Sequence, residues 1–150
     1  MDLTTAMLAD AARVAEGKLY ILGGQWDRVT VATLPAVHPS MAVVLVIRIE
    51  YSEAPTTFDV LVDLMLDGNS TGVRAGGRVS IGHAPGLAHG APQFAPVAAT
   101  FANVSFDRLG RYEFVVSVGG RVLGQIPLEV VQGMVISVPG DGKPPGQPTE

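Results

Sequence analysis

The sequence predicts an all-β fold, a two-sheet antiparallel sandwich of about eight strands that is immunoglobulin-like in its general architecture. Three observations predict it. Apolar and polar residues alternate with a period of two in several segments, which indicates half-buried strands. The 18 glycines and 11 prolines permit many chain reversals. With 47% hydrophobic and 16% charged residues, most of the chain is expected to fold, as one domain over residues 1–138.

The N-terminal segment is interpreted as a hairpin, with strands over residues 3–9 and 18–23 and a turn at Glu16 and Gly17. The second strand contains Leu, Tyr and Ile residues of high β propensity. A helix over residues 6–15 is the alternative, because this stretch is rich in Ala and Leu and Gly17 could end it. We favour the hairpin because it supplies strands that a two-sheet fold needs.

The clearest strand signal covers residues 58–67, where the alternation is unbroken. Residues 42–51 are expected to pair with it as a hairpin, through a turn at 52–55. Each strand directs one apolar face toward the core. The predicted core residues are Val43, Leu45, Ile47, Ile49, Tyr51, Phe58, Val60, Val62, Leu64 and Leu66.

The outer face of this expected hairpin is also apolar, through Val44, Val46, Leu61 and Met65. An antiparallel sheet with one solvated face should carry polar residues there, and a contiguous apolar surface usually marks an interface. We therefore expect self-association through these residues. The alternative is an internal cover over the same face, supplied by a loop at 82–93 or by the N-terminal segment if that segment is a helix.

Two shorter strands, over residues 78–83 and 96–101, are expected to flank a Gly/Pro-rich loop at 82–90. A second hairpin then joins residues 111–118 to residues 122–130.

This second hairpin contains a Gly119–Gly120 step. A three-residue loop or a bulge that pairs Val118 with Val122 keeps the core face apolar. Before it, Tyr112 follows Gly110 in a pattern that resembles the tyrosine corner of immunoglobulin-like sandwiches. In that corner a Tyr at the start of a strand bonds to the backbone of the preceding turn.

Residues 139–150 are rich in Pro and Gly, and we expect them to form a disordered tail. The N-terminus has no recognisable secretory signal, and the longest apolar run, residues 41–47, is too short to span a membrane. The chain has no cysteine, which excludes disulfides and thiolate catalysis. A cytoplasmic location is therefore expected.

The formal net charge is −4, and no cluster of Lys or Arg occurs. A nucleic-acid partner needs a basic surface, so this class of partner is not expected.

The segment from Ala9 to Val29 combines an Ala-Asp step, a Gly-Lys turn, an aliphatic strand ending in Gly-Gly, and a Trp-Asp pair. It resembles the opening of an uncharacterised bacterial family that is frequent in actinobacteria. The closing strands of that family are similar to the segments 110–114 and 127–130. The resemblance implies a β-sandwich and brings no known activity, substrate or cofactor.

Trp26, Asp27 and Arg28 form the first candidate binding site, with an aromatic platform and an Arg able to bind a planar anion. The competing interpretation is a core Trp whose polar neighbours stabilise an irregular strand. A second string, Gly68 to Gly72, matches the G-x-S-x-G nucleophile elbow around Ser70. No convincing helix follows it, so a surface turn is the favoured interpretation.

His38, His83 and His89 are the only histidines, and their spacing has no metal-site signature. Asp59, Asp63 and Asp67 share one face of a strand. Residues four apart on a strand are about 13 Å apart, too far for one calcium ion to bridge. These carboxylates are expected to be solvent-side charges.

No catalytic residue, metal or cofactor is predicted. The favoured function is a non-enzymatic binding or assembly module that docks a protein partner or a second copy. A hydrolase or metal-dependent enzyme using the His83 and His89 loop is one alternative. A carbohydrate-binding sandwich is another, weakened because Tyr20, Tyr51 and Tyr112 are mostly expected to point inward.

Overall fold

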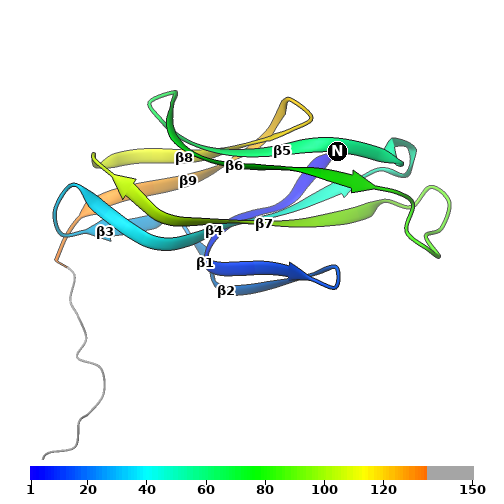
Figure 1. Cartoon of the computed structure of the whole chain (residues 1–150), viewed down its shortest axis with the longest axis horizontal. Coiled ribbons are helices and arrows are strands. Elements are labelled where there is room, and N and C mark those ends of the chain that lie inside the picture. The colour runs from blue at the N-terminus through cyan, green and yellow to red at the C-terminus, as the bar shows by residue number, and fades with distance from the viewer. Residues whose placement is uncertain (135–150) are drawn as a thin grey trace, which may run out of the picture.

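The structure, a computed structural model, describes residues 1–134. The expected tail at 139–150 lies outside the described residues. The described chain forms two sheets (Figure 1). Sheet A has the order β2–β1–β4–β7, with strands β1 (Asp2–Ala15), β2 (Lys18–Trp26), β4 (Ala36–Ile49) and β7 (Gln93–Phe106). Sheet B has the order β3–β9–β8–β5–β6, with strands β3 (Arg28–Val31), β5 (Thr56–Leu66), β6 (Asn69–Ile81), β8 (Gly110–Val118) and β9 (Arg121–Gln132).

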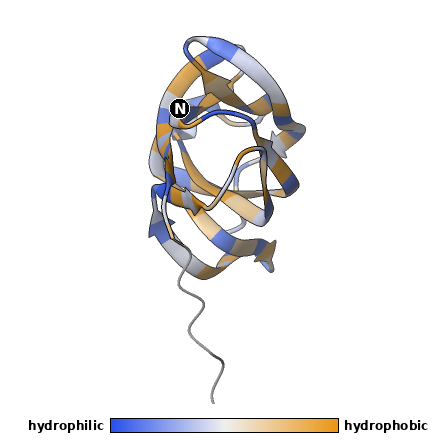
Figure 2. Cartoon of the chain, turned by 90° about the vertical axis from the view of Figure 1, so that its left-hand side faces the viewer, coloured by the Kyte–Doolittle hydropathy of each residue, from blue (hydrophilic) through white to orange (hydrophobic). Residues whose placement is uncertain are grey.

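The expected all-β sandwich is confirmed. The two sheets face each other as layers when the molecule is viewed end-on (Figure 2). Between them lies one large apolar core, which includes Leu8, Leu45, Leu64, Phe106 and Phe114, each at most 1% exposed. The described strands number nine rather than about eight, and β3 pairs with β9 in parallel. The sandwich is therefore not wholly antiparallel.

The N-terminal hairpin is confirmed, and the helix alternative is wrong. β1 and β2 pair antiparallel, from Ala15 opposite Lys18 at the turn to Leu8 opposite Trp26. Glu16 and Gly17 have φ angles of 52° and 71°, as a two-residue type I′ turn requires.

The expected pairing of residues 42–51 with residues 58–67 is wrong. β4 pairs with β1 and β7, whereas β5 pairs with β6 and β8. The chain crosses from sheet A to sheet B through a short 3₁₀ helix, η1 (Tyr51–Glu53). The period of two shows which face of a strand is buried, but it does not show which strand lies beside it.

β6 begins well before the expected range of 78–83, and β7 extends past both ends of the expected range of 96–101. Both are edge strands. Many of their residues are Gly, Ala, Ser or Thr, whose side chains give only a weak alternation signal.

The hairpin of β8 and β9 closes with Val118 opposite Arg121. The expected pairing of Val118 with Val122 is wrong because Gly119 and Gly120, with φ angles of 58° and 80°, form a two-residue loop. A bulge does occur, between Val116 and Ser117. It shifts the register so that the apolar residues of β9 face the core. The tyrosine corner at Tyr112 is confirmed.

Within residues 1–134, no helix is long and apolar enough to cross a membrane.

Candidate functional site

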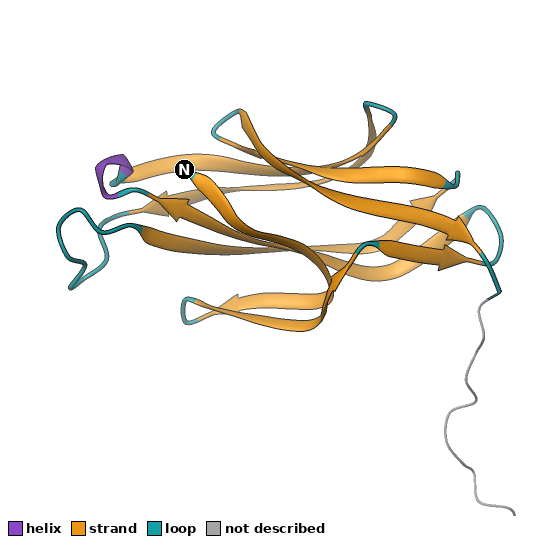
Figure 3. Ribbon diagram, turned by 180° about the vertical axis from the view of Figure 1, so that it is seen from behind, coloured by secondary structure: helices purple, strands orange, loops and turns teal. Residues whose placement is uncertain are grey.

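The hairpin of β1 and β2 departs from sheet A. β1 pairs with β4 only as far as Ala9, and it pairs with β2 from Leu8 to Ala15. Beyond Ala9 the hairpin therefore has no neighbouring strand on either side among residues 1–134. Figure 1 and, from behind, Figure 3 show it extending beneath the sandwich. We call residues 10–23 the projecting hairpin.

One face of the projecting hairpin packs on the outer face of sheet A. Ala9, Ala42 and Val44 are fully buried there, and Ala12 and Leu19 from the hairpin pack against them. An isolated two-stranded hairpin is only marginally stable in water. This small second core therefore holds the hairpin against the sandwich.

Backbone irregularities direct the hairpin away from the sheet. The register shifts between Leu8 and Ala9, and Gly23 and Gln25 have φ angles of 58° and 65°. A Cβ atom added at Gly23 would overlap the carboxylate of Asp10. The register shift leaves Gln25 as the extra residue of a bulge directly after the Gly-Gly step. Gly23 is required both for its φ angle and for the close approach of Asp10.

Large apolar side chains are concentrated on the hairpin. Eleven large hydrophobic residues are exposed within the described chain, and four of them are hairpin residues. These four are Val14 (40% exposed), Tyr20 (50%), Ile21 (41%) and Leu22 (70%). Such clustering on a small element is typical of an interaction surface.

Arg13 lies beside this cluster, with its guanidinium carbon 5.8 Å from the centre of the Tyr20 ring. A shallow depression of about 340 Å³ lies on the projecting hairpin, lined by Ala11, Ala12, Arg13, Tyr20, Ile21 and Leu22.

The outer edge of β2 is chemically suited to accept another strand. From Leu19 to Gln25 it carries no charged residue and no proline. In a two-residue hairpin the first residue after the loop faces its partner strand. The amides of Leu19, Ile21 and Gly23 therefore face outward. Proteins usually protect such an edge with charges, prolines or a covering segment.

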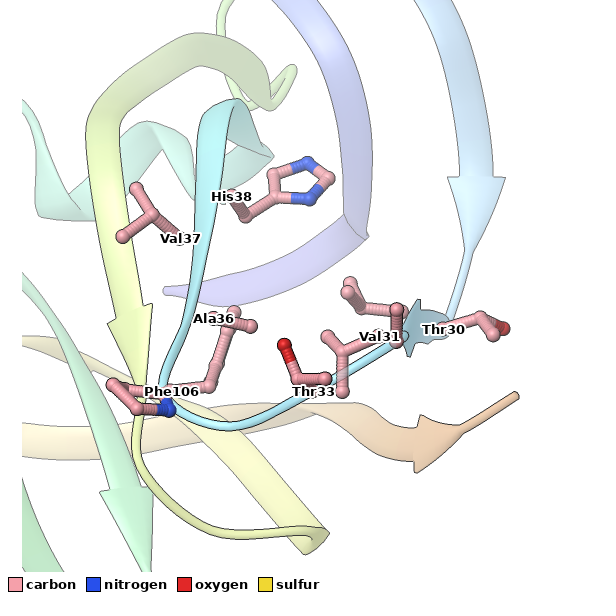
Figure 4. Close-up of a pocket in the computed structure, with 10 residues that line it drawn as sticks. Thr30, Val31, Thr33, Ala36, Val37, His38 and Phe106 are labelled. Carbon is pink, nitrogen blue, oxygen red and sulfur yellow. The ribbon is translucent and has the colours of Figure 1, made fainter. Parts of the chain in front are cut away.

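A pocket of about 260 Å³ is lined mainly by β3, the first residues of β4 and the segment that joins them. His38 lies at the opposite end of this pocket from Thr33 and Phe106 (Figure 4). The lining residues include threonines and one imidazole but no carboxylate. The lining therefore lacks the paired acid and base that hydrolysis commonly uses.

The structure separates the three residues of the predicted Trp26–Arg28 site. Trp26 is partly buried against the main core, and its ring centre is 5.9 Å from that of His38. Its indole nitrogen is buried and has no hydrogen-bond partner within the described chain. Asp27 is exposed, and Arg28 pairs with Glu129 at 3.1 Å. The Trp ring is not an exposed platform beside a free Arg.

The four expected interface residues do not form one surface. Val44 and Val46 belong to β4 of sheet A, and Leu61 and Met65 belong to β5 of sheet B. Val44 is fully buried beneath the projecting hairpin, whereas Leu61 is 37% exposed. The internal cover by the N-terminal segment is thus observed over Val44, with the segment forming strands.

The loop between β6 and β7 brings two imidazoles to Tyr51. The ring centres of His83 and His89 lie 4.2 Å and 4.6 Å from that of Tyr51. Among residues 1–134, no group of three or more His, Cys, Asp or Glu side chains could hold a metal ion. Of the tyrosines expected to point inward, Tyr112 is buried but Tyr20 is half exposed.

Only Gly68 of the string around Ser70 lies in a turn, and residues 69–72 already belong to strand β6. Ser70 is therefore a strand residue rather than part of the expected surface turn, and no helix follows it within the described chain. The Ser70 hydroxyl donates a 2.7 Å hydrogen bond to Asp63.

Three Asp–Arg ion pairs lie along β5 and its neighbours: Asp59–Arg78, Asp63–Arg74 and Asp67–Arg108. Asp59 and Asp67 are solvent-side charges, as expected, but Asp63 is only 9% exposed. Partial burial raises the pKa of Asp63. Hydrogen bonds from Arg74 and Ser70 more than offset that effect, so the pKa lies below its usual value.

The fold and the projecting hairpin define a two-layer β-sandwich that presents a free apolar strand at one edge. The chain belongs to a family of unknown function, DUF6941, whose profile matches residues 4–131. No curated protein and no solved structure is significantly similar to it.

Proposed function

We propose that this domain is a non-enzymatic protein-binding module, and that it binds an extended protein segment by strand addition to the outer edge of β2. The observation that carries the proposal is the uncharged edge from Leu19 to Gln25, which pairs with no other strand of the described chain and lies beside four exposed apolar side chains. In strand addition, main-chain hydrogen bonds supply affinity and alternate side chains supply specificity.

The two faces of β2 suit this role differently. Leu19 packs against the small core of Ala9, Ala42 and Val44, so it fixes the strand against sheet A. Tyr20 and Leu22 point to the opposite face, together with Arg13 of β1. A bound strand would therefore meet a pre-positioned edge and an apolar face with one aromatic ring. A fixed edge lowers the entropic cost of binding.

The proposal is tested with a displayed library of random peptides, selected on the immobilised chain. We expect the selected peptides to have alternating apolar residues and to bind Ile21→Pro at least about tenfold more weakly, because proline removes an outward amide and blocks the edge. Ile21→Lys is the second variant, in case proline perturbs the hairpin. Val122→Lys, at an exposed position of β9, is the matched control and should bind normally. Equal binding to all variants would contradict the proposal.

A further inference from the structure

We propose that the segment that pairs with β2 is β2 of a second copy of this chain, in an antiparallel arrangement about a two-fold axis. This inference rests on the proposed function and names its partner. A second copy necessarily presents an unpaired strand of the same length and chemistry. Pairing the two strands also closes both free β2 edges at once, which ends the assembly at a dimer.

The backbone geometry selects the register. Gly23 and Gln25 have positive φ angles, so the regular extended part of β2 runs from Lys18 to Leu22. A two-fold axis perpendicular to the strands places one residue opposite itself. Pairing of all five regular residues requires that residue to be Tyr20.

The side chains that this register brings together are complementary. Tyr20 meets Tyr20 of the second copy. Leu19 meets Ile21 of the second copy, and the Lys18 side chain covers Leu22 of the second copy. Aromatic pairs and aliphatic pairs are favourable cross-strand neighbours. The two Lys18 residues are four positions apart along the strands, roughly 13 Å, so they do not face each other.

The charge of the hairpin is compatible with a second copy as the partner. The chain as a whole carries a net charge of −4. The projecting hairpin contains Asp10, Arg13, Glu16 and Lys18 as its charged residues, and their sum is zero. The two chains can therefore meet at this hairpin without bringing like net charges together. An edge of five residues is small, so we expect a dimer with a Kd on the order of 10 µM.

The test uses sedimentation equilibrium of the full chain up to about 500 µM, well above the expected Kd, together with single-cysteine scanning. Because the natural sequence has no cysteine, one introduced cysteine per chain can form a disulfide only between two copies. We expect a concentration-dependent dimer and maximal disulfide formation for Tyr20→Cys, falling at positions 18 and 22. Val122→Cys, exposed on the other sheet, is the control.

Leu22→Lys should leave the fold intact, because this side chain is 70% exposed, and should weaken dimerisation by at least about tenfold. Two results would overturn the inference. One is a monomer at all concentrations, and the other is a dimer that crosslinks no better at Tyr20→Cys than at Val122→Cys. If such a protein still binds the selected peptides through Ile21, the proposed function stands and only the second copy is rejected. If neither binding occurs, both fail.

Discussion

The Tyr112 hydroxyl donates a 2.8 Å hydrogen bond to the backbone carbonyl of Arg108, four residues earlier in the chain. Tyr112 is 5% exposed, and its ring meets Phe106 edge-on, with ring centres 5.2 Å apart. Burial raises the pKa of the Tyr112 hydroxyl, so it stays a protonated donor at neutral pH. The bond fixes the turn that leads into β8, next to the main core.

Tyr112→Phe is expected to lower the free energy of unfolding by about 1 kcal/mol, because it removes this bond but keeps the ring in the core. Denaturant unfolding at neutral pH measures the change. Tyr20→Phe, at a half-exposed position, is the control and should stay within about 0.5 kcal/mol of the parent protein. Equal effects of the two substitutions would show that the tyrosine corner does not stabilise the fold.

Val44→Lys and Leu61→Lys should differ sharply in their effect on the free energy of unfolding. Val44 is fully buried beneath the projecting hairpin, and burying an unpaired ammonium group there should cost at least about 3 kcal/mol. Leu61 is 37% exposed on the outer face of sheet B, so Leu61→Lys should change stability by less than about 1 kcal/mol. Thermal unfolding of each single variant separates them. A stable Val44→Lys protein would refute the packing of the hairpin on sheet A.

Asp63 should make stability depend on pH in the acidic range. Its pKa is lowered in the folded protein, so its contribution is present above the unfolded pKa of 3.8. That contribution disappears as the pH falls through the folded pKa. Asp63→Asn should therefore cost about 1 kcal/mol at pH 7, discounted because Arg74 is half exposed.

The difference between the parent protein and Asp63→Asn should shrink near pH 3. The matched control is Asp59→Asn, because Asp59 forms the same kind of pair with Arg78 but is exposed. Its effect should be smaller at every pH. If the stability difference between the parent protein and Asp63→Asn stays the same in acid, the ion pair is not the cause of that difference.

Gly23→Ala should loosen the projecting hairpin. A side chain at this position must adopt a left-handed φ and displace the Asp10 carboxylate, at a cost of roughly 1–3 kcal/mol. The main core does not include this residue. Proteolysis should therefore cut the hairpin of Gly23→Ala faster than that of the parent protein. Gly17→Asn is the control, because Asn tolerates the turn conformation. Equal cleavage of both variants would contradict this role of Gly23.

The sequence was sufficient to predict the sandwich, its inward faces and the tyrosine corner, because burial imposes alternation along a strand. It could not predict that β4 and β5 lie in different sheets. Both strands are apolar, and a short connection can turn a strand back or carry it to the opposite layer. For that reason Val44 and Val46 lie on a different sheet from Leu61 and Met65, instead of sharing the one face that was expected.

The exposed edge of β2 was missed, although the sequence contains a signal for it. Leu19, Tyr20, Ile21 and Leu22 are consecutive apolar residues, so both faces of this strand are apolar. Such a run usually indicates a strand buried on both faces. Here one face covers sheet A and the other is exposed, which only the topology reveals.

Residue-resolved amide hydrogen exchange tests the central claim most directly, that the outer edge of β2 accepts another strand. The amides of Leu19 and Ile21 face outward, and the amides of Tyr20 and Leu22 face β1. On addition of a selected peptide, or at high protein concentration if a second copy is the partner, exchange at Leu19 and Ile21 should slow by at least about tenfold. Exchange in sheet B should not change. Unchanged exchange at Leu19 and Ile21 in the presence of bound partner would contradict the account.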